Sequence, residues 1–301
     1  MKSTKAWLLI AGAMILAGLL LFGGVMTMLQ WDFCKLGTEN FETNTYEITD
    51  SYADISVLTK EALVVFMPST DGKTKVVCYE TEKQKHAVSV CDGVLVITQE
   101  DTRAWYDHIG LHIGTPKITV YLPEETYGAL TVKAGTGGVQ MSGGYRFDCV
   151  DISVTTGDIA MKDLALGSMT LSVSTGDITV WRVECAGDAK FTSSTGKLDL
   201  KSLQCKNLTS RGTTGKITMV YVLVEENMTL KRSVGDISLE KCDAYEISIT
   251  TSTGNVSGSL WTKKVFQVKT STGRVSVPQT TGDGLCVITT GTGNIDITVF
   301  R

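Results

Sequence analysis

The chain has 301 residues, enough for one large domain or two ordinary ones. Its 28 Lys and Arg against 32 Asp and Glu give a net charge of −4 without a basic run, which argues against a nucleic-acid partner. The 30 Gly and only 4 Pro favour many strands joined by regular turns over a disordered or helical chain.

The three His and eight Cys residues limit the chemistry that the chain could carry. His108 and His112 are spaced for one helical face, but Gly, Ile and Leu surround them, so a loop pair without a metal is the simpler interpretation. The absence of a Cys-x-x-Cys pair argues against a zinc ribbon or a thioredoxin-type site. The sequence therefore predicts no catalytic residue, no cofactor-binding residue and no metal ligand.

The first predicted element is a transmembrane helix over residues 6–29, a run of 24 residues without a charge. At roughly 1.5 Å per residue this helix is about 36 Å long, enough to cross a hydrocarbon core of roughly 30 Å with some tilt. Lys2 and Lys5 precede it, so the positive-inside rule predicts a single-pass protein of the cell membrane, with residues 1–5 as a cytoplasmic tail and the bulk of the chain outside. A cleaved signal peptide is the alternative, although the run is long for one and no clean A-x-A site follows.

Residues 30–45 are predicted to be a linker, and residues 46–125 an irregular β region that caps the next domain or continues it irregularly. Short β-rich runs support strands there, at residues 54–58, 62–67, 75–80, 87–91, 94–99 and 117–122. Residues 75–91 resemble a hairpin that turns around residues 82–85. One register of this hairpin would place Cys78 opposite Cys91 and would permit a disulfide.

Residues 126–301 repeat with a period of 19 or 20 residues. A Gly follows Thr, and once Val, at Gly137, Gly157, Gly176, Gly196, Gly215, Gly235, Gly254, Gly273 and Gly293. The residue two positions after each of these Gly is always aliphatic. Such a period predicts a β-solenoid, a parallel β-helix of about nine coils, roughly 40 Å long at about 4.8 Å per coil.

Within each coil, apolar columns fall at positions −7, −5, +2, +4 and +7 from the Gly. Spacing by two is the period of strands that turn one face inward. The inward parity changes at the Gly and again before +7, so each coil should bend twice, with Gly taking positive φ at the first bend. An antiparallel sandwich is the alternative, but the strict register of the columns argues against it.

The position after each Gly forms a polar column along the solenoid. Asp177 would lie beside Lys197, and Lys216 beside Asp236, as charge pairs between neighbouring coils. The column lacks Asp on every coil, which excludes a calcium ladder of the repeat-in-toxin type.

Cysteines also fall at defined places in the repeat. Cys185 and Cys205 both lie nine residues after a repeat Gly, so we expect them to stack on neighbouring coils, where a disulfide is a hypothesis. Cys242 and Cys286 lie in apolar columns and should fill the core.

Several motifs together resemble a known bacterial family. They are Ser-Tyr-Ala-Asp-Ile at 51–55, Asp-Gly-Val-Leu-Val-Ile at 92–97, Trp-Tyr-Asp at 105–107, Pro-Lys-Ile-Thr-Val-Tyr-Leu-Pro at 116–123, and the repeated Thr-Gly-Asp-Ile. Each motif is weak alone, but the set is similar to a β-strand-repeat family of unknown function whose members are often labelled as suspected adhesins. The resemblance covers nearly everything after residue 45. It implies a membrane-anchored β-solenoid and supplies no catalytic residue.

Three functions follow as hypotheses. The first is a surface binding or structural protein that contacts an unknown envelope polymer or protein. The second, which some members' apparent link to envelope stress suggests, is a sensor or regulatory subunit that works through a membrane partner, because a five-residue tail is too short to signal alone. The third and least favoured is a glycan-active enzyme, so the sequence predicts that the protein is not an enzyme.

The positions that break the repeat are where we expect a functional surface. They are residues 105–112, Val234, Gly258 with Trp261, and the C-terminal edge. The sequence stops at Phe300 and Arg301, just past the ninth repeat, which would leave a strand edge open for end-to-end self-association.

Overall fold

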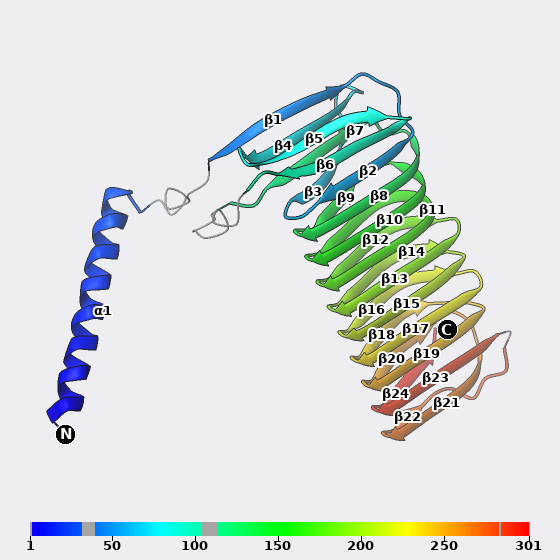
Figure 1. Ribbon diagram of the computed structural model, residues 1–301. Coiled ribbons are helices and arrows are strands. Elements are labelled where there is room, and N and C mark those ends of the chain that lie inside the picture. The colour runs from blue at the N-terminus through cyan, green and yellow to red at the C-terminus, as the bar shows by residue number, and fades with distance from the viewer. Residues whose placement is uncertain (1, 32–39, 104–113, 283, 301) are drawn as a thin grey trace.

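The computed structural model describes residues 2–31, 40–103, 114–282 and 284–300. One helix, α1 (Lys2–Met28), stands apart from an all-β body (Figure 1). Its segment Trp7–Met28 has a mean hydropathy of 2.5 and is long and apolar enough to cross a membrane. A signal sequence near the N-terminus has the same length and apolar composition.

The strands of the β body form two long stacks that face each other across the core (Figure 1). The first stack runs in the order β5 (Gln84–Cys91), β6 (Val94–Asp101), β2 (Asp54–Thr59), β8 (Thr126–Thr136), β10 (Arg146–Thr156), the second half of β11 (Ile159–Thr175), β13 (Asp188–Thr195), β15 (Asn207–Thr214), β17 (Asn227–Val234), β19 (Glu246–Thr253), β23 (Leu285–Thr292) and β21 (Val265–Thr272). The second runs in the order β1 (Phe41–Ile48), β4 (Thr74–Thr81), β7 (Lys117–Leu122), β3 (Leu63–Pro68), β9 (Val139–Ser142), the first half of β11, β12 (Ile178–Cys185), β14 (Leu198–Cys205), β16 (Ile217–Val224), β18 (Ile237–Cys242), β20 (Val256–Leu260), β24 (Ile295–Val299) and β22 (Val275–Ser276).

The predicted β-solenoid is confirmed: consecutive strands alternate between the stacks, and each pairs in parallel with a strand about 20 residues away. Within the described residues, the nine repeat Gly correspond to nine coils, from β8–β9 to the coil of β23 and β24. Among the strands that the structure describes, only those of the N-terminal end pair antiparallel, namely β1 with β4, β4 with β5 and β7, and β5 with β6.

The predicted inward columns form the core. In one coil, Ile178, Val180 and Val183 of β12 face Ala189 and Phe191 of β13, and all five are buried. The same positions are buried in one continuous cluster that extends along the solenoid. This follows from the strand period, because every second side chain enters the space between the two stacks.

Both predicted bends are present in each regular coil. At the first bend, the nine repeat Gly have φ between 133° and 157°, a region that side chains with a Cβ rarely adopt. At the second, six residues after the Gly, non-glycine residues take the left-handed conformation with φ between 51° and 57°: Asp163, Arg182, Ser202, Tyr221 and Lys241. The second bend lies inside one continuous strand, so each of these coils has two long strands and no third segment.

The polar column after the Gly is a hydrogen-bond ladder, and the predicted charge pairs are wrong. The backbone N–H of Lys197 donates to Asp177 Oδ1 at 2.7 Å, and that of Asn255 donates to Asp236 Oδ1 at 2.8 Å. Within the described part of the chain, no ion pair joins Asp177 to Lys197 or Lys216 to Asp236. The carboxylates bond to backbone amides instead of lysine side chains because the amides are already fixed in place. An ion pair would also require a flexible lysine side chain to become ordered.

The coils at both ends do not follow chain order. At the N-terminal end, the coil of β2 and β3 lies between the strands β6 and β7 on one side and β8 and β9 on the other. At the C-terminal end, the coil of β23 and β24 is inserted between that of β19 and β20 and that of β21 and β22. The predicted open edge at Phe300 is therefore wrong, since the outermost strands are β21 and β22.

Neither predicted disulfide forms, because Cys78, Cys91, Cys185 and Cys205 are all free thiols. The hairpin turns where predicted, but its strands diverge: β4 and β5 pair only at Thr81 and Gln84, and then join different stacks. Cys78 therefore points into the core, while Cys91 is exposed. Cys242 and Cys286 are buried in the core as predicted.

Candidate functional site

A groove runs along one flank of the solenoid across β11, β12, β14 and β16, which are neighbours in the second stack. It consists of two adjoining hollows of about 420 and 660 Å³ that share Ala165, Glu184, Gln204 and Leu223. We name it the flank groove. Its polar and aromatic lining residues include Arg146, Asp163, Arg182, Glu184, Ser202, Gln204 and Tyr221. Four coils at about 4.8 Å spacing make it roughly 14 Å long, parallel to the solenoid axis.

The second bend of each coil shapes this groove. Asp163, Arg182, Ser202 and Tyr221 line it, and all four are in the left-handed conformation. That conformation costs about 1–2 kcal/mol per non-glycine residue and persists where the surrounding structure fixes it. Here the parallel ladders on either side fix each bend, so the four side chains form a row with one residue from each coil.

Aromatic rings beside the groove are held in place but remain open to solvent. The Trp181 ring centroid lies 4.5 Å from Lys162 Nζ and 4.2 Å from Arg182 Cζ. Lys241 Nζ donates to the Tyr221 hydroxyl at 3.0 Å. Trp181 and Tyr221 are 40% and 42% exposed, so part of each ring remains open to solvent. Cation–π contacts at exposed sites contribute about 0.5–1 kcal/mol each and restrict the rings.

The charges of the flank groove nearly balance. Arg182 donates from Nε and Nη2 to the carboxylate of Asp163 on the neighbouring coil, and this hydrogen bond lowers the pKa of Asp163. The acid of a glycosidase needs a raised pKa, so Asp163 is suited to hold Arg182 and not to donate a proton. Because Arg146 and Arg182 oppose Asp163, Glu184 and Glu225, no single sign of charge dominates.

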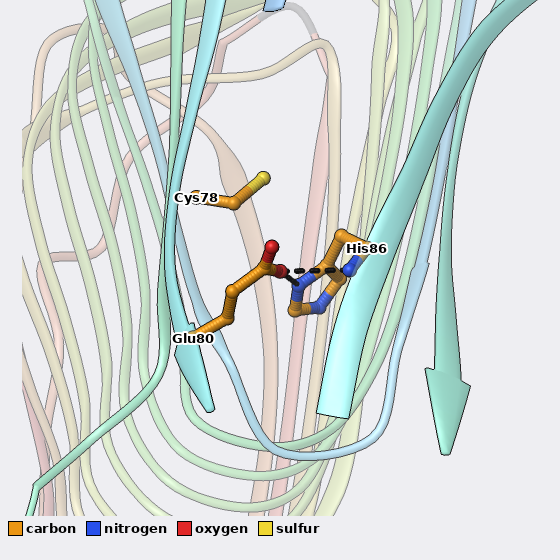
Figure 2. A group of neighbouring side chains, drawn as sticks. All are labelled: Cys78, Glu80 and His86. Carbon is orange, nitrogen blue, oxygen red and sulfur yellow. Dashed lines mark hydrogen bonds and ion pairs between the residues drawn. The ribbon is translucent and has the colours of Figure 1, made fainter. Parts of the chain in front are cut away.

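A second polar group lies inside the N-terminal end of the solenoid. Cys78 and Glu80 are two residues apart on β4 and share a face, while His86 reaches them from β5 (Figure 2). All three are at most 2% exposed, and one donor atom from each lies within 4.8 Å of the others. A thiolate, a carboxylate and an imidazole are ligands that zinc accepts, so these three residues could hold a metal ion. We name them the cap cluster.

Hydrogen bonds orient the cap cluster. Glu80 Oε2 is 2.7 Å from both the backbone N and Nδ1 of His86, and Oε1 accepts from Asn44 Nδ2 at 2.8 Å. Cys78 lies beside this pair. Burial, and to a lesser degree the nearby Glu80, raise the pKa of the Cys78 thiol to about 12.

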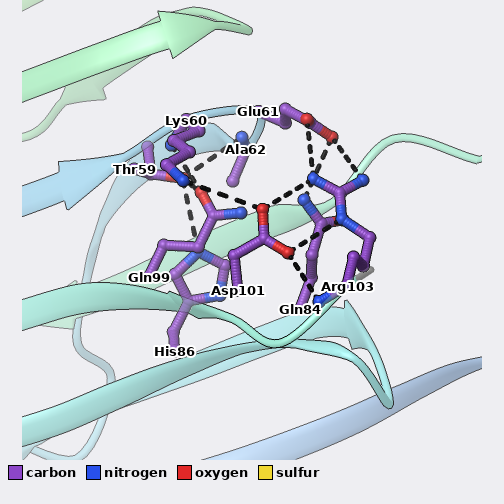
Figure 3. A network of polar contacts seen from close by, with 9 residues as sticks. All are labelled: Thr59, Lys60, Glu61, Ala62, Gln84, His86, Gln99, Asp101 and Arg103. Atoms are coloured by element: carbon purple, nitrogen blue, oxygen red, sulfur yellow. Dashed lines mark hydrogen bonds and ion pairs between the residues drawn. The ribbon is translucent and has the colours of Figure 1, made fainter. Parts of the chain in front are cut away.

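A wider polar network adjoins the cap cluster at His86 (Figure 3). Thr59 Oγ1 is 3.3 Å from His86 Nε2 and donates to Gln99 Oε1 at 3.1 Å. Nearby, Arg103 forms hydrogen bonds through Nε and Nη2 with both carboxylate oxygens of Asp101, each at 2.9 Å, and lowers the pKa of Asp101 to about 2. Arg103 Nη2 also donates to Glu61 Oε1 at 3.0 Å, which ties the end of β6 to the loop after β2.

The structure places the repeat-breaking positions as follows. Residues 105–112, with His108 and His112, lie outside the described residues. Trp261 packs edge-to-face on Phe300, with ring centroids 4.9 Å apart, and lines a hollow of about 710 Å³ at the C-terminal end. Gly258 allows close backbone approach, because a Cβ there would overlap the Leu239 carbonyl. Val234 lies exposed on β17, away from both hollows of the flank groove.

Sequence reasoning missed both the flank groove and the cap cluster. The signal for the groove was the column six residues after the Gly. Arg182 and Tyr221 lie in this column, at the point where the inward parity of the strand changes for the second time. The signal for the cap cluster was Cys-x-Glu on a strand, followed by a turn and His86. Neither signal shows which residues from other elements would face it.

Comparison with known proteins locates the chain among its relatives. No curated protein matches it. Three solved structures described as “putative adhesin” cover 87% of this chain and 98% of their own. They come from Bacteroides fragilis (14% identity, TM-score 0.47), Parabacteroides distasonis (13%, 0.47) and Parabacteroides merdae (12%, 0.43). At these values the three structures are no guide to function. The model of the family described as Toastrack DUF4097 matches residues 52–298, nearly the whole β body, and the chain belongs to that family.

Proposed function

We propose that the protein is a membrane-anchored binding protein of the cell envelope whose flank groove takes up an uncharged polysaccharide. The observation that carries this proposal is the row of groove residues that repeats from coil to coil with the spacing of the strands. A groove parallel to the axis suits a linear polymer. Its planar polar side chains suit hydroxyl groups, the Tyr221 ring suits the apolar face of a sugar, and the balanced charge disfavours a polyanion.

In this proposal α1 is the membrane anchor, with residues 1–5 in the cytoplasm and the solenoid outside. The apolar segment Trp7–Met28 and the two lysines before it support this orientation. Binding, not cleavage, is proposed because the Asp163 carboxyl is held by Arg182 with a lowered pKa.

The test is binding of fluorescent neutral and anionic polysaccharides to the full chain, both in detergent and on intact cells that express it. We expect a neutral polysaccharide to bind in both settings. Tyr221→Ala should weaken binding about tenfold, which corresponds to roughly 1.4 kcal/mol, the size of a typical aromatic contact at an interface.

Tyr245→Ala is the matched control, because Tyr245 is 59% exposed and does not line the groove. Equal effects of the two substitutions, or binding of anionic polymers only, would contradict the proposed ligand. Binding in detergent but not on intact cells would contradict the proposed orientation. Co-purification of a transmembrane partner without polysaccharide binding would instead favour the sensor function.

A further inference from the structure

The cap cluster lies where the two stacks of strands meet at the N-terminal end of the solenoid. β4 belongs to the second stack and β5 to the first, so Cys78 and Glu80 face His86 across the interior (Figure 2). These three polar side chains are fully or almost fully buried at the end of the apolar core, together with other buried polar residues such as Thr59. Buried polar groups of this kind are expensive unless a partner satisfies them.

The groups around the cap cluster hold its donor atoms as the surroundings of a metal site do. Metal-bound imidazoles usually donate their second N–H to an oxygen, and here Thr59 Oγ1 lies 3.3 Å from His86 Nε2. Metal-bound carboxylates are usually hydrogen-bonded in turn, and here Asn44 donates to Glu80 Oε1 at 2.8 Å. The hydroxyl of Thr59 is itself directed by Gln99. The imidazole of His86 and the carboxylate of Glu80 are therefore each held in orientation by a hydrogen-bonding neighbour outside the cluster.

The donor set of the cluster fits a divalent ion. A thiolate from Cys78 and a carboxylate from Glu80 supply two negative charges to a bound ion, and the imidazole of His86 is a neutral ligand. A divalent ion would displace the thiol proton of Cys78 to solvent, so the loaded buried site would carry no net charge.

We propose that Cys78, Glu80 and His86 form a structural site for a divalent, thiophilic transition metal of the zinc type. The three protein donors leave one position of a tetrahedral ion for a solvent molecule. The ion would be bound as the cap folds and would link the two stacks at the end where the hairpin strands diverge.

The test uses the full chain, purified in detergent, with Zn²⁺ and Co²⁺ as probes. After exposure to Zn²⁺ and removal of the excess, we expect one tightly held equivalent per chain. We also expect a thermal midpoint several degrees above that of the EDTA-treated protein. With Co²⁺, we expect the near-ultraviolet charge-transfer band that reports a thiolate ligand.

Cys78→Ser should abolish the Co²⁺ band and lower the affinity for Zn²⁺ by more than about 100-fold. Thr59→Val, which acts through His86, should lower the affinity for Zn²⁺ about 10- to 100-fold. Cys91→Ser, an exposed cysteine of the same hairpin, should change neither. The proposal is overturned if the unaltered chain retains no Zn²⁺ and shows no thiolate band. This measurement does not depend on whether any variant folds. It is equally overturned if Cys78→Ser binds as well as the unaltered chain.

Discussion

Arg232 is a charged residue at an inward position of β17 and is only 4% exposed. Its Nη1 donates to the carbonyl of Ser193, two coils away, at 3.1 Å, while Nε and Nη2 find no partner among the described atoms. Gly212 lies between them, and a Cβ there would overlap Nη1. Burial lowers the pKa of Arg232, and within the described chain no carboxylate forms an ion pair with it. We therefore expect the arginine to weaken the core locally.

We expect Arg232→Met to raise the free energy of unfolding by about 1–3 kcal/mol, because an apolar side chain of similar length replaces an unpaired buried charge. Thermal unfolding of the full chain, followed by circular dichroism, measures the change. Lys231→Met, on the same strand but facing solvent, should change stability by less than about 0.5 kcal/mol. A loss of stability in Arg232→Met would show that its contact with Ser193 outweighs the desolvation of the guanidinium.

Each regular coil is one element with two bends, and the bends use different chemistry. At the first bend, Gly196 has φ of +145°, and a Cβ there would overlap the carbonyl oxygen of Gly176 on the preceding coil. At the second bend of the same coil, Ser202 has φ of +53°, a region that L residues can enter at modest cost. The glycine is therefore required by both its dihedral and its neighbour, while the serine is only tolerated.

Gly196→Ala should lower the free energy of unfolding by at least about 2 kcal/mol, since strain and overlap add. Ser202→Gly should change it by less than about 1 kcal/mol, because relief of the left-handed strain is offset by a more flexible unfolded chain. Thermal midpoints of the two variants compare the bends directly. Similar small changes in both would mean that the coils can shift apart enough to admit a Cβ.

At the scale of the molecule, the two ends of the solenoid differ. At the N-terminal end the added strands pair antiparallel, and β1 and β5 are the outermost strands. At the C-terminal end β21 and β22 are outermost, and no further strand of the described residues pairs with their outer edges (Figure 1). Val265 and Val275 of this edge are 44% and 43% exposed. Apolar edge strands of this kind pair readily with other strands.

We propose that two chains associate through the edge of β21 and β22. Light scattering of the full chain in detergent, as protein concentration increases, should show dimers that the double substitution Val265→Lys and Val275→Lys abolishes. Val234→Lys is the control, because Val234 is 47% exposed but lies away from this end. A monomer at every concentration, or dimers that survive the charged edge, would refute the proposed interface.

The sequence by itself determined the repeat, its inward columns and both bends. These are local consequences of the strand period and of glycine at one corner, so Ile178 and Val183 could be placed in the core without knowing their neighbours. The apolar helix could likewise be predicted from length and composition. Thr59 could not be connected with His86, nor Asn44 with Glu80, because the two residues of each pair come from strands far apart in the sequence.

Only the tertiary structure decided which coil lies beside which. Every coil presents the same columns to a neighbour, so the repeat pattern alone cannot distinguish chain order from the insertion of β24 between β20 and β22. Longer connections allow that crossing: residues 277–284 separate β22 from β23, while two residues separate β12 from β13. The flank groove needs side chains from four coils, and the cap cluster needs two diverging strands to face each other across the core. Both arise from contacts between stacked elements, which local sequence does not specify.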